Sequence, residues 1–327
     1  EGLAKGIEGR LALYDQLEEL QRQLTLPTFH TGSPAFLPML SKTDEAIAHL
    51  ATHPHFADTM SYLNRFRQVQ ARALAIIKSE VASSLQAATE QVQAQMKDAA
   101  AQGQHMEVSV AYVQYQAVGE SIRGMMQAVA ARSSWSWEYR NLLTECQHIF
   151  FKQRLALLTP SVSAKIAAAI VGSDLAESMR AGCAALCDLC HREYKLFQRF
   201  FPVLEGQVPL ETLLEPFCTM LIDALRPLYL KTVRVDVLCG LVVILKGEIL
   251  EDQVELRGAS LAAMRPCVAT LLHEVQERLT FRATILIRDE IQAYSPTKAD
   301  VDYPNKLTSA AAAKPGVNDG GGGGSSW

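Results

Sequence analysis

The sequence lacks both an excess of positive charge and a long apolar run that is free of charge. Its 31 lysines and arginines are outnumbered by 35 aspartates and glutamates, which leaves a net charge of −4. Proteins that bind nucleic acid directly carry a basic surface, so this balance argues against nucleic-acid binding. The apolar stretch at residues 233–250 contains Arg234, Asp236 and Lys246, which argues against a transmembrane helix. We therefore expect at most a peripheral association with membranes.

The sequence also lacks the motifs of common enzyme classes. It contains no glycine-rich phosphate loop, no dinucleotide-binding glycine motif, no serine-hydrolase elbow and no H-E-x-x-H zinc motif. Acid pairs such as Glu251-Asp252 and Asp289-Glu290 are adjacent on expected helices, where neighbouring side chains point about 100° apart. They do not converge on one reacting group. We predict no catalytic residues, no cofactor and no enzyme activity.

Cysteine is scarce, and its seven copies do not form the pattern of a disulfide framework. Their number is odd, and Cys146, Cys218 and Cys239 lie inside apolar helical patterns. This arrangement is typical of reduced core residues in a protein that faces the cytosol.

One cluster of soft ligands lies on a single expected helix, at Cys183, Cys187, Cys190 and His191. Four such residues suggest a zinc site. On a continuous helix, however, the first and last are about 12 Å apart along the axis, which is too far to surround one ion at about 2.0–2.3 Å. We interpret them as core residues and predict no metal site. A helical zinc enzyme built on these residues is the alternative.

What is abundant is apolar residues at helical spacing. Residues 210–225 place one apolar face at steps of three and four: Leu213, Leu214, Phe217, Met220, Leu221, Ala224 and Leu225. Arg226-Pro227 should then kink or break the helix. The valine-rich continuation to Leu256 is too long for an ordinary buried strand, so we predict a helix there as well. The fold class is predicted to be all-α.

The chain divides into five expected parts. A coiled-coil-like helix at 1–26 precedes a proline-rich and glycine-rich linker at 27–39. A long helical hairpin or bundle follows at 40–158, with one helix of roughly 60–70 Å that ends near Ala101. Thr159-Pro160 should end a helix, so a second helical bundle is expected at 159–294. The alanine-rich and glycine-rich tail at 295–327 is expected to be disordered. The whole is predicted to be an elongated helical rod.

A heptad-like seam in the first part supplies the candidate interaction site. Leu13, Leu17, Leu20 and Leu24 alternate in steps of four and three. This seam pairs with a helix of another subunit, or it belongs to an amphipathic helix packed on its own domain. The pattern is already helical at Glu1, which is not an initiator methionine, so we expect the sequence to be a piece of a longer protein.

Motifs along most of the chain occur in the same order as in one known family. They include Phe36-x-Pro38-Met39-Leu40, Tyr62-Leu63-x-Arg65-Phe66, Phe151-x-x-Arg154-x-x-Leu157-Leu158-x-Pro160, Val275-Gln276-Glu277-Arg278-Leu279 and Tyr303-Pro304-Asn305-Lys306-Leu307. They resemble the N-terminal region of the third subunit of the conserved oligomeric Golgi complex, a vesicle-tethering family of the CATCHR type. The likeness as a whole spans about residues 11 to 307. The spacer at 99–108 and the tail depart from the family pattern.

The resemblance implies a peripheral protein on the cytosolic face of Golgi membranes that acts in retrograde transport within the Golgi. It also implies partners among the other subunits of the tethering complex, SNAREs, Rab GTPases and coiled-coil tethers, and no catalytic residues. The alternative function is a helical scaffold or adaptor that binds helical peptides. Against it, no period of about 30 to 50 residues recurs along the chain.

Overall fold

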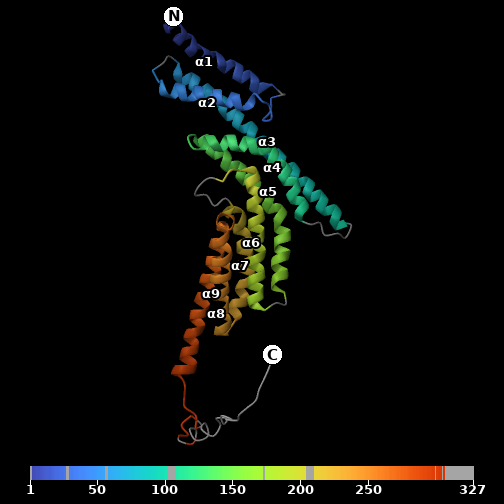
Figure 1. Ribbon diagram of the computed structural model, residues 1–327, viewed down its shortest axis with the longest axis vertical. Coiled ribbons are helices and arrows are strands. Elements are labelled where there is room, and N and C mark those ends of the chain that lie inside the picture. The colour runs from blue at the N-terminus through green and yellow to red at the C-terminus, as the bar shows by residue number, and fades with distance from the viewer. Residues whose placement is uncertain are drawn as a thin grey trace, which may run out of the picture.

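The computed structural model shows an elongated arrangement of helices (Figure 1). It describes residues 2–26, 29–55, 58–101, 108–171, 174–203, 210–298, 300–303 and 305, and side chains throughout these ranges except those of 2–13, 100 and 108–111. Within these ranges every regular element is a helix, which confirms the predicted all-α class. None of the helices in the described ranges is both long and apolar enough to span a bilayer.

The first half of the chain is dominated by one very long helix. Its elements are α1 (Gly2–Thr25), α2 (Phe36–Thr52), α3 (Thr59–Ala101), α4 (Val108–Ser133) and α5 (Trp137–Ile170). The 43 residues of α3 correspond to about 65 Å of helix, as the sequence predicted. Figure 1 shows α3 running from the α1–α2 end across the molecule, with α4 returning beside it.

The second half is a bundle of helices whose axes run in nearly the same direction or in the opposite one (Figure 1). Its elements are α6 (Leu175–Phe200), α7 (Glu211–Lys231), α8 (Val235–Val243), the π-helix η1 (Ile244–Glu255), the 3₁₀ turns η2 (Gly258–Ser260) and η3 (Ala262–Met264), α9 (Arg265–Leu286) and the π-helix η4 (Ile287–Gln292). The valine-rich stretch is therefore helical, as predicted.

One prediction made from a proline is wrong, and a second is wrong in part. We expected Thr159-Pro160 to end a helix, yet α5 continues through Pro160 to Ile170. We also expected a kink or a break at Pro227; α7 continues through it to Lys231, so there is no break. A proline removes one backbone hydrogen bond but does not remove the packing on either side of it. Buried residues flank both prolines, at Leu158 and Val162 and at Leu225 and Tyr229, and this packing holds both helices continuous.

The ends of two predicted segments also differ from the structure. Helix α2 begins at Phe36, because Phe36, Met39 and Leu40 are buried, so the last residues of the expected linker already form its first turn. The connection after Ala101, at residues 102–107, lies outside the described residues, and so does most of the expected disordered tail, from residue 306 onward.

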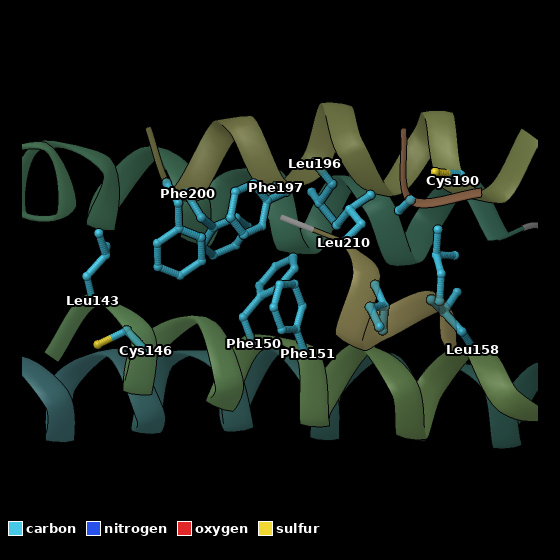
Figure 2. Close-up of a cluster of buried hydrophobic side chains, with 14 of the residues drawn as sticks. Leu143, Cys146, Phe150, Phe151, Leu158, Cys190, Leu196, Phe197, Phe200 and Leu210 are labelled. Atoms are coloured by element: carbon cyan, nitrogen blue, oxygen red, sulfur yellow. The ribbon is translucent and has the colours of Figure 1, made fainter. Parts of the chain in front are cut away.

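An aromatic cluster joins the two halves. Phe150 and Phe151 of α5 point toward Phe197 and Phe200 of α6 (Figure 2). The rings of Phe150 and Phe200 have centroids 5.0 Å apart, and those of Phe151 and Phe197 are 5.8 Å apart and stacked. Such rings bury large apolar areas and add contact energy beyond that burial. The long α5 therefore carries the core from one half of the rod into the other.

Candidate functional site

The predicted interface leucines of α1 lie mostly against the protein's own helices. Leu17 and Leu20 are buried, and Leu24 is half-buried against the same core. Helix α1 packs on α3 and more lightly on α2, and the Tyr14 ring meets the Tyr62 ring edge-on at 4.6 Å. The side chain of Leu13 lies outside the described residues. The structure therefore has the arrangement of the second reading of the seam, an amphipathic helix packed on its own domain.

The opposite face of α1 is polar. Asp15, Glu18, Glu19 and Arg22 are exposed there, and Arg22 contacts Glu19 within the same face. From residue 14 to Thr25, where the side chains of α1 are described, this outer face presents charge rather than a second apolar seam.

A buried ion pair joins α5 to α6 in the middle of the rod. Arg154 donates from Nε and Nη2 to the Glu193 carboxylate at 2.8 and 2.6 Å, and both side chains are fully buried. Tyr112 of α4 donates its hydroxyl to the same carboxylate. Burial alone would lower the pKa of Arg154, but the adjacent Glu193 carboxylate outweighs burial and raises it. Three helices are fixed by one carboxylate.

The same arginine lies over aromatic rings. Its guanidinium carbon is 4.6 Å from the ring centroid of Tyr115 and 5.0 Å from that of Tyr112, which is a cation–π geometry. The Tyr115 hydroxyl is 2.6 Å from Thr89 Oγ1 on α3. The network therefore extends over four helices, from α3 to α6.

A second polar network centres on Asp44 of α2. Its carboxylate accepts hydrogen bonds from Gln70 of α3 at 2.8 Å, Arg132 of α4 at 3.0 Å and Tyr139 of α5 at 2.9 Å. Burial raises the pKa of Asp44, and the three donors oppose that shift. Here one buried carboxylate joins four helices.

Neither network is suited to chemistry on a substrate. Arg154 and Glu193 are fully buried, Asp44 is almost so, and the carboxylate oxygens already accept hydrogen bonds from within the protein. A catalytic acid or base must reach its substrate, whereas a buried network whose charges are paired rigidifies a core. The sequence analysis did not assign these roles. The sequence feature that could have indicated the buried ion pair is Arg154, which lies between the apolar residues Phe151 and Leu157 of one helix.

The cysteine cluster of α6 is part of the core. Cys183, Cys187 and Cys190 are buried, while His191 is only half-buried beside them. Burial raises the pKa of the Cys183 thiol to about 12 and that of Cys187 to about 11. The described residues contain no group of three or more His, Cys, Asp or Glu side chains arranged to hold a metal ion.

All seven cysteines are free thiols, as predicted. One of them was placed wrongly by the sequence analysis, because Cys239 is exposed rather than part of the core. Helix α8 is apolar nearly all round, so its sequence does not show which face turns inward. The structure buries Leu238 and Leu241 and leaves Cys239 and Val243 outside.

The last turns of α9, the helix η4 and the turn after it carry a group of exposed apolar side chains. Val268, Leu271 and Val275, in the first part of α9, are fully buried. Beyond them, five large apolar side chains are between 39% and 67% exposed: Phe281, Leu286, Ile287, Ile291 and Tyr294. Figure 1 shows this end of α9 extending past α8. We call these five residues the α9 end surface.

Two arginines fix the start of this surface to the bundle. Arg278 donates to the carbonyl oxygen of Thr232 at 3.2 Å, and Arg282 donates to that of Val233 at 3.2 Å. Thr232 and Val233 lie in the turn between α7 and α8, where Val233 itself is exposed. The α9 end surface therefore emerges from an anchored helix.

Comparison with known proteins gives one consistent result. Residues 108–322 match the family model described as conserved oligomeric Golgi complex subunit 3, C-terminal, and residues 1–87 match the corresponding N-terminal model. The chain is 32% identical over 307 residues to the human protein of that name and 32% identical over 312 residues to the Drosophila melanogaster protein. It is 23% identical over 338 residues to the protein of Saccharomyces cerevisiae.

These relatives are considerably longer than the chain. The human and Drosophila alignments each cover 93% of the chain but 37% and 34% of the relative, and the yeast alignment covers 97% of the chain and 42% of the relative. No solved structure is significantly similar to the chain.

Proposed function

Since the chain belongs to the family of conserved oligomeric Golgi complex subunit 3, we propose that it acts as one subunit of a multisubunit vesicle tether associated with the Golgi. The chain spans about 37% of the length of its human relative. The proposal therefore concerns what this part contributes to the assembly. We propose that this contribution is helix-mediated contact with other subunits rather than catalysis.

The observation that carries this proposal is the α9 end surface. Five large apolar side chains, between 39% and 67% exposed, follow one another within 14 residues on the end of an anchored helix. Exposed apolar clusters of this kind are typical of protein interaction sites, and an apolar helix face commonly docks against another helix. We propose that the occupant is a helix of another subunit of the same complex, because the relatives are named as subunits of an oligomeric complex.

The interior supports the mechanical side of the proposal. A tethering subunit needs reach and a fixed direction, and both come from long helices that cannot slide along one another. The networks at Glu193 and Asp44 each hold four helices at a defined register. Buried charges that are paired with one another are well suited to this role, since any shift of register would leave a buried charge without its partner.

The role of α1 in subunit contact stays a prediction. Leu17 and Leu20 already contact the protein's own core. A second subunit could reach them only after α1 leaves α3. A contact through the polar outer face, with Glu19 and Arg22, needs no such rearrangement.

The family resemblance extends the proposal to partners and location. We propose peripheral association with the cytosolic face of Golgi membranes, a role in retrograde vesicle transport within the Golgi, and contacts with SNAREs, Rab GTPases and coiled-coil tethers. The network carboxylates of Asp44 and Glu193 are closed off from solvent, which is consistent with a protein that binds other proteins and does not catalyse a reaction.

The proposal is tested by co-purification of the tagged protein from cells, with the variant Phe281→Ser/Ile291→Ser compared with the wild type. Both positions are exposed, so the helical content and melting temperature should be unchanged while the recovery of other subunits falls at least tenfold. The matched control is Glu277→Gln/Thr284→Ser on the exposed polar part of α9, which should leave recovery unchanged. Unchanged recovery with the serine variant would remove the α9 end surface from the proposal.

A further inference from the structure

Two cysteines from different helices line the wall of one groove in the second bundle. Cys218 lies in the middle of α7, and Cys267 lies in the first turn of α9. Both line the same groove, of about 370 Å³, whose walls also include Glu211, Glu215 and Thr270. Helices α7 and α9 pack directly on each other. A small solute can therefore enter from solvent and reach both cysteines at one place.

The two thiols also affect each other's ionisation. The interaction with Cys267 lowers the pKa of Cys218, although burial and Glu215 oppose the shift. The pKa of Cys267 is raised, first by the interaction with Cys218 and then by burial. The thiolate is therefore favoured at Cys218.

The other buried cysteines differ from this pair. Burial raises the pKa of Cys146 to about 12 and that of Cys183 to about 12. Neither of them lines the groove. Because only the thiolate is nucleophilic, the groove pair combines access for a reagent with a favoured thiolate.

We propose that Cys218 and Cys267 are a modification site at which a small hydroperoxide, such as hydrogen peroxide, produces a reversible disulfide between α7 and α9. The Cys218 thiolate attacks one peroxide oxygen, which breaks the O–O bond and gives a sulfenic acid and hydroxide. Hydroxide takes up the proton lost by Cys218 and leaves as water. The Cys267 sulfur then attacks the sulfenic sulfur, the S–O bond breaks, and the Cys267 proton leaves with the hydroxyl as a second water. Two thiols are oxidised and one peroxide is reduced to two waters.

The charge on the groove favours a neutral oxidant. Glu211 and Glu215 contribute two carboxylates to its wall, and these repel anionic reagents such as glutathione disulfide. Hydrogen peroxide is uncharged and small enough to enter. The bond would tie α7 to the start of α9 and close a long loop of chain, which limits the freedom of the unfolded state.

The test uses protein in which the exposed Cys239 is replaced (Cys239→Ser), because this thiol would otherwise link two molecules. The protein is treated with hydrogen peroxide, alkylated and digested without reduction, and the peptides are identified by mass spectrometry. We expect one linked pair, containing Cys218 and Cys267, two hydrogens lighter than the sum of its peptides. Dithiothreitol should remove the link, and the oxidised protein should melt at a higher temperature than the reduced protein.

Variants separate this pair from general oxidation. Cys218→Ser and Cys218→Ala should each abolish the linked peptide, while Cys146→Ser, at a buried position outside the groove, should leave it unchanged. Glutathione disulfide at the same concentration should form the link at least tenfold more slowly. Alkylation of both Cys218 and Cys267 after peroxide treatment, or a link from either one to Cys183 or Cys187, would overturn the proposal.

Discussion

Arg154 of α5 and Glu193 of α6 form a two-point ion pair in which neither side chain is exposed to solvent. The pair lies beside the aromatic cluster of Phe150 and Phe197, where α5 carries the core from one half of the rod into the other. Replacement of one partner leaves a charge buried without its counter-ion, which costs far more than loss of a surface pair. This relationship gives the first prediction.

Arg154→Met should lower the free energy of unfolding by about 3–5 kcal/mol. The double variant Arg154→Met/Glu193→Gln should recover part of that loss, because the neutral amide removes the unpaired charge and can still accept from Tyr112. Urea unfolding followed by circular dichroism measures both values. If the effects of the two substitutions were instead additive, the loss of stability in Arg154→Met would not come from an unpaired buried charge on Glu193.

A glycine at the α6–α7 contact gives the second prediction. A Cβ atom on Gly182 would lie 2.6 Å from Cδ1 of Leu221, which is fully buried, whereas a Cβ on Gly124 in α4 would meet nothing within 4 Å. Gly182→Ala should therefore destabilise the protein by about 1–3 kcal/mol through overpacking. Gly124→Ala should stabilise it by up to about 1 kcal/mol, since alanine is the better helix former. Thermal melts of the two variants should shift in opposite directions, and equal shifts would contradict the close approach of α6 and α7.

The packing of α1 gives the third prediction. Because Leu17 is fully buried within the chain, Leu17→Ala should cost about 2–5 kcal/mol of local stability. Glu18→Ala, on the exposed side of the same turn, should change stability by less than about 0.5 kcal/mol. Hydrogen exchange of the α1 amides measures the local stability of both variants. Equal protection in Leu17→Ala and the wild type would mean that α1 does not depend on this contact.

Substitution of Leu17 or Leu20 should detach α1 from its own domain. If partner binding is lost in such a variant, this detachment alone is enough to explain the loss. It is therefore not evidence that another subunit touches these leucines directly. A substitution on the outer face, such as Arg22→Ala, separates the two cases.

The fourth prediction concerns pH. Arg226 holds the pKa of Glu274 below its ordinary value of 4.5 through hydrogen bonds of 2.9 and 2.7 Å, against an opposing effect of burial. A carboxyl group with a lowered folded-state pKa contributes stability that is fully present above its unfolded-state pKa and is lost as the pH falls through the folded-state pKa. The pair is partly exposed, so the contribution should be on the order of 0.5–1 kcal/mol.

The measurement is the free energy of unfolding of wild type and Glu274→Gln between about pH 6 and about pH 3. The variant should be less stable than the wild type at the upper end, and the difference should shrink as the pH falls below 4.5. Asp44, whose pKa is raised by burial, contributes the opposite slope but is common to both proteins. A constant difference across the range would contradict the lowered pKa of Glu274.

Periodicity was enough to predict the helical class and the length of α3, because apolar residues at every third or fourth position fit few structures other than an amphipathic helix. It also identified the buried face of α7 at Leu213, Leu214 and Phe217. The local rule for proline failed at Pro160, where packing between elements distant in the sequence keeps the helix continuous. A stripe likewise does not reveal what covers it. Leu17 and Ile291 have similar patterns, yet one is buried by α3 and the other is exposed.

The buried polar networks could not have been predicted from spacing. Arg154 and Glu193 are 39 residues apart, and Asp44 and Tyr139 are 95 apart. Each pairing depends on how long helices cross, which no local pattern records. The thiol pair of Cys218 and Cys267 is of the same kind, since nothing in the spacing of these two cysteines indicates that they line one groove.

The most direct test of the central claim is photo-crosslinking from position 287 in the assembled complex. Ile287 is half exposed within the α9 end surface, so a photoreactive amino acid can be incorporated there without disturbing the core. The account predicts a crosslink to a helix of another subunit of the Golgi tethering complex, and none when the group is placed at the exposed Glu80 of α3. Crosslinks confined to the protein's own chain would contradict it.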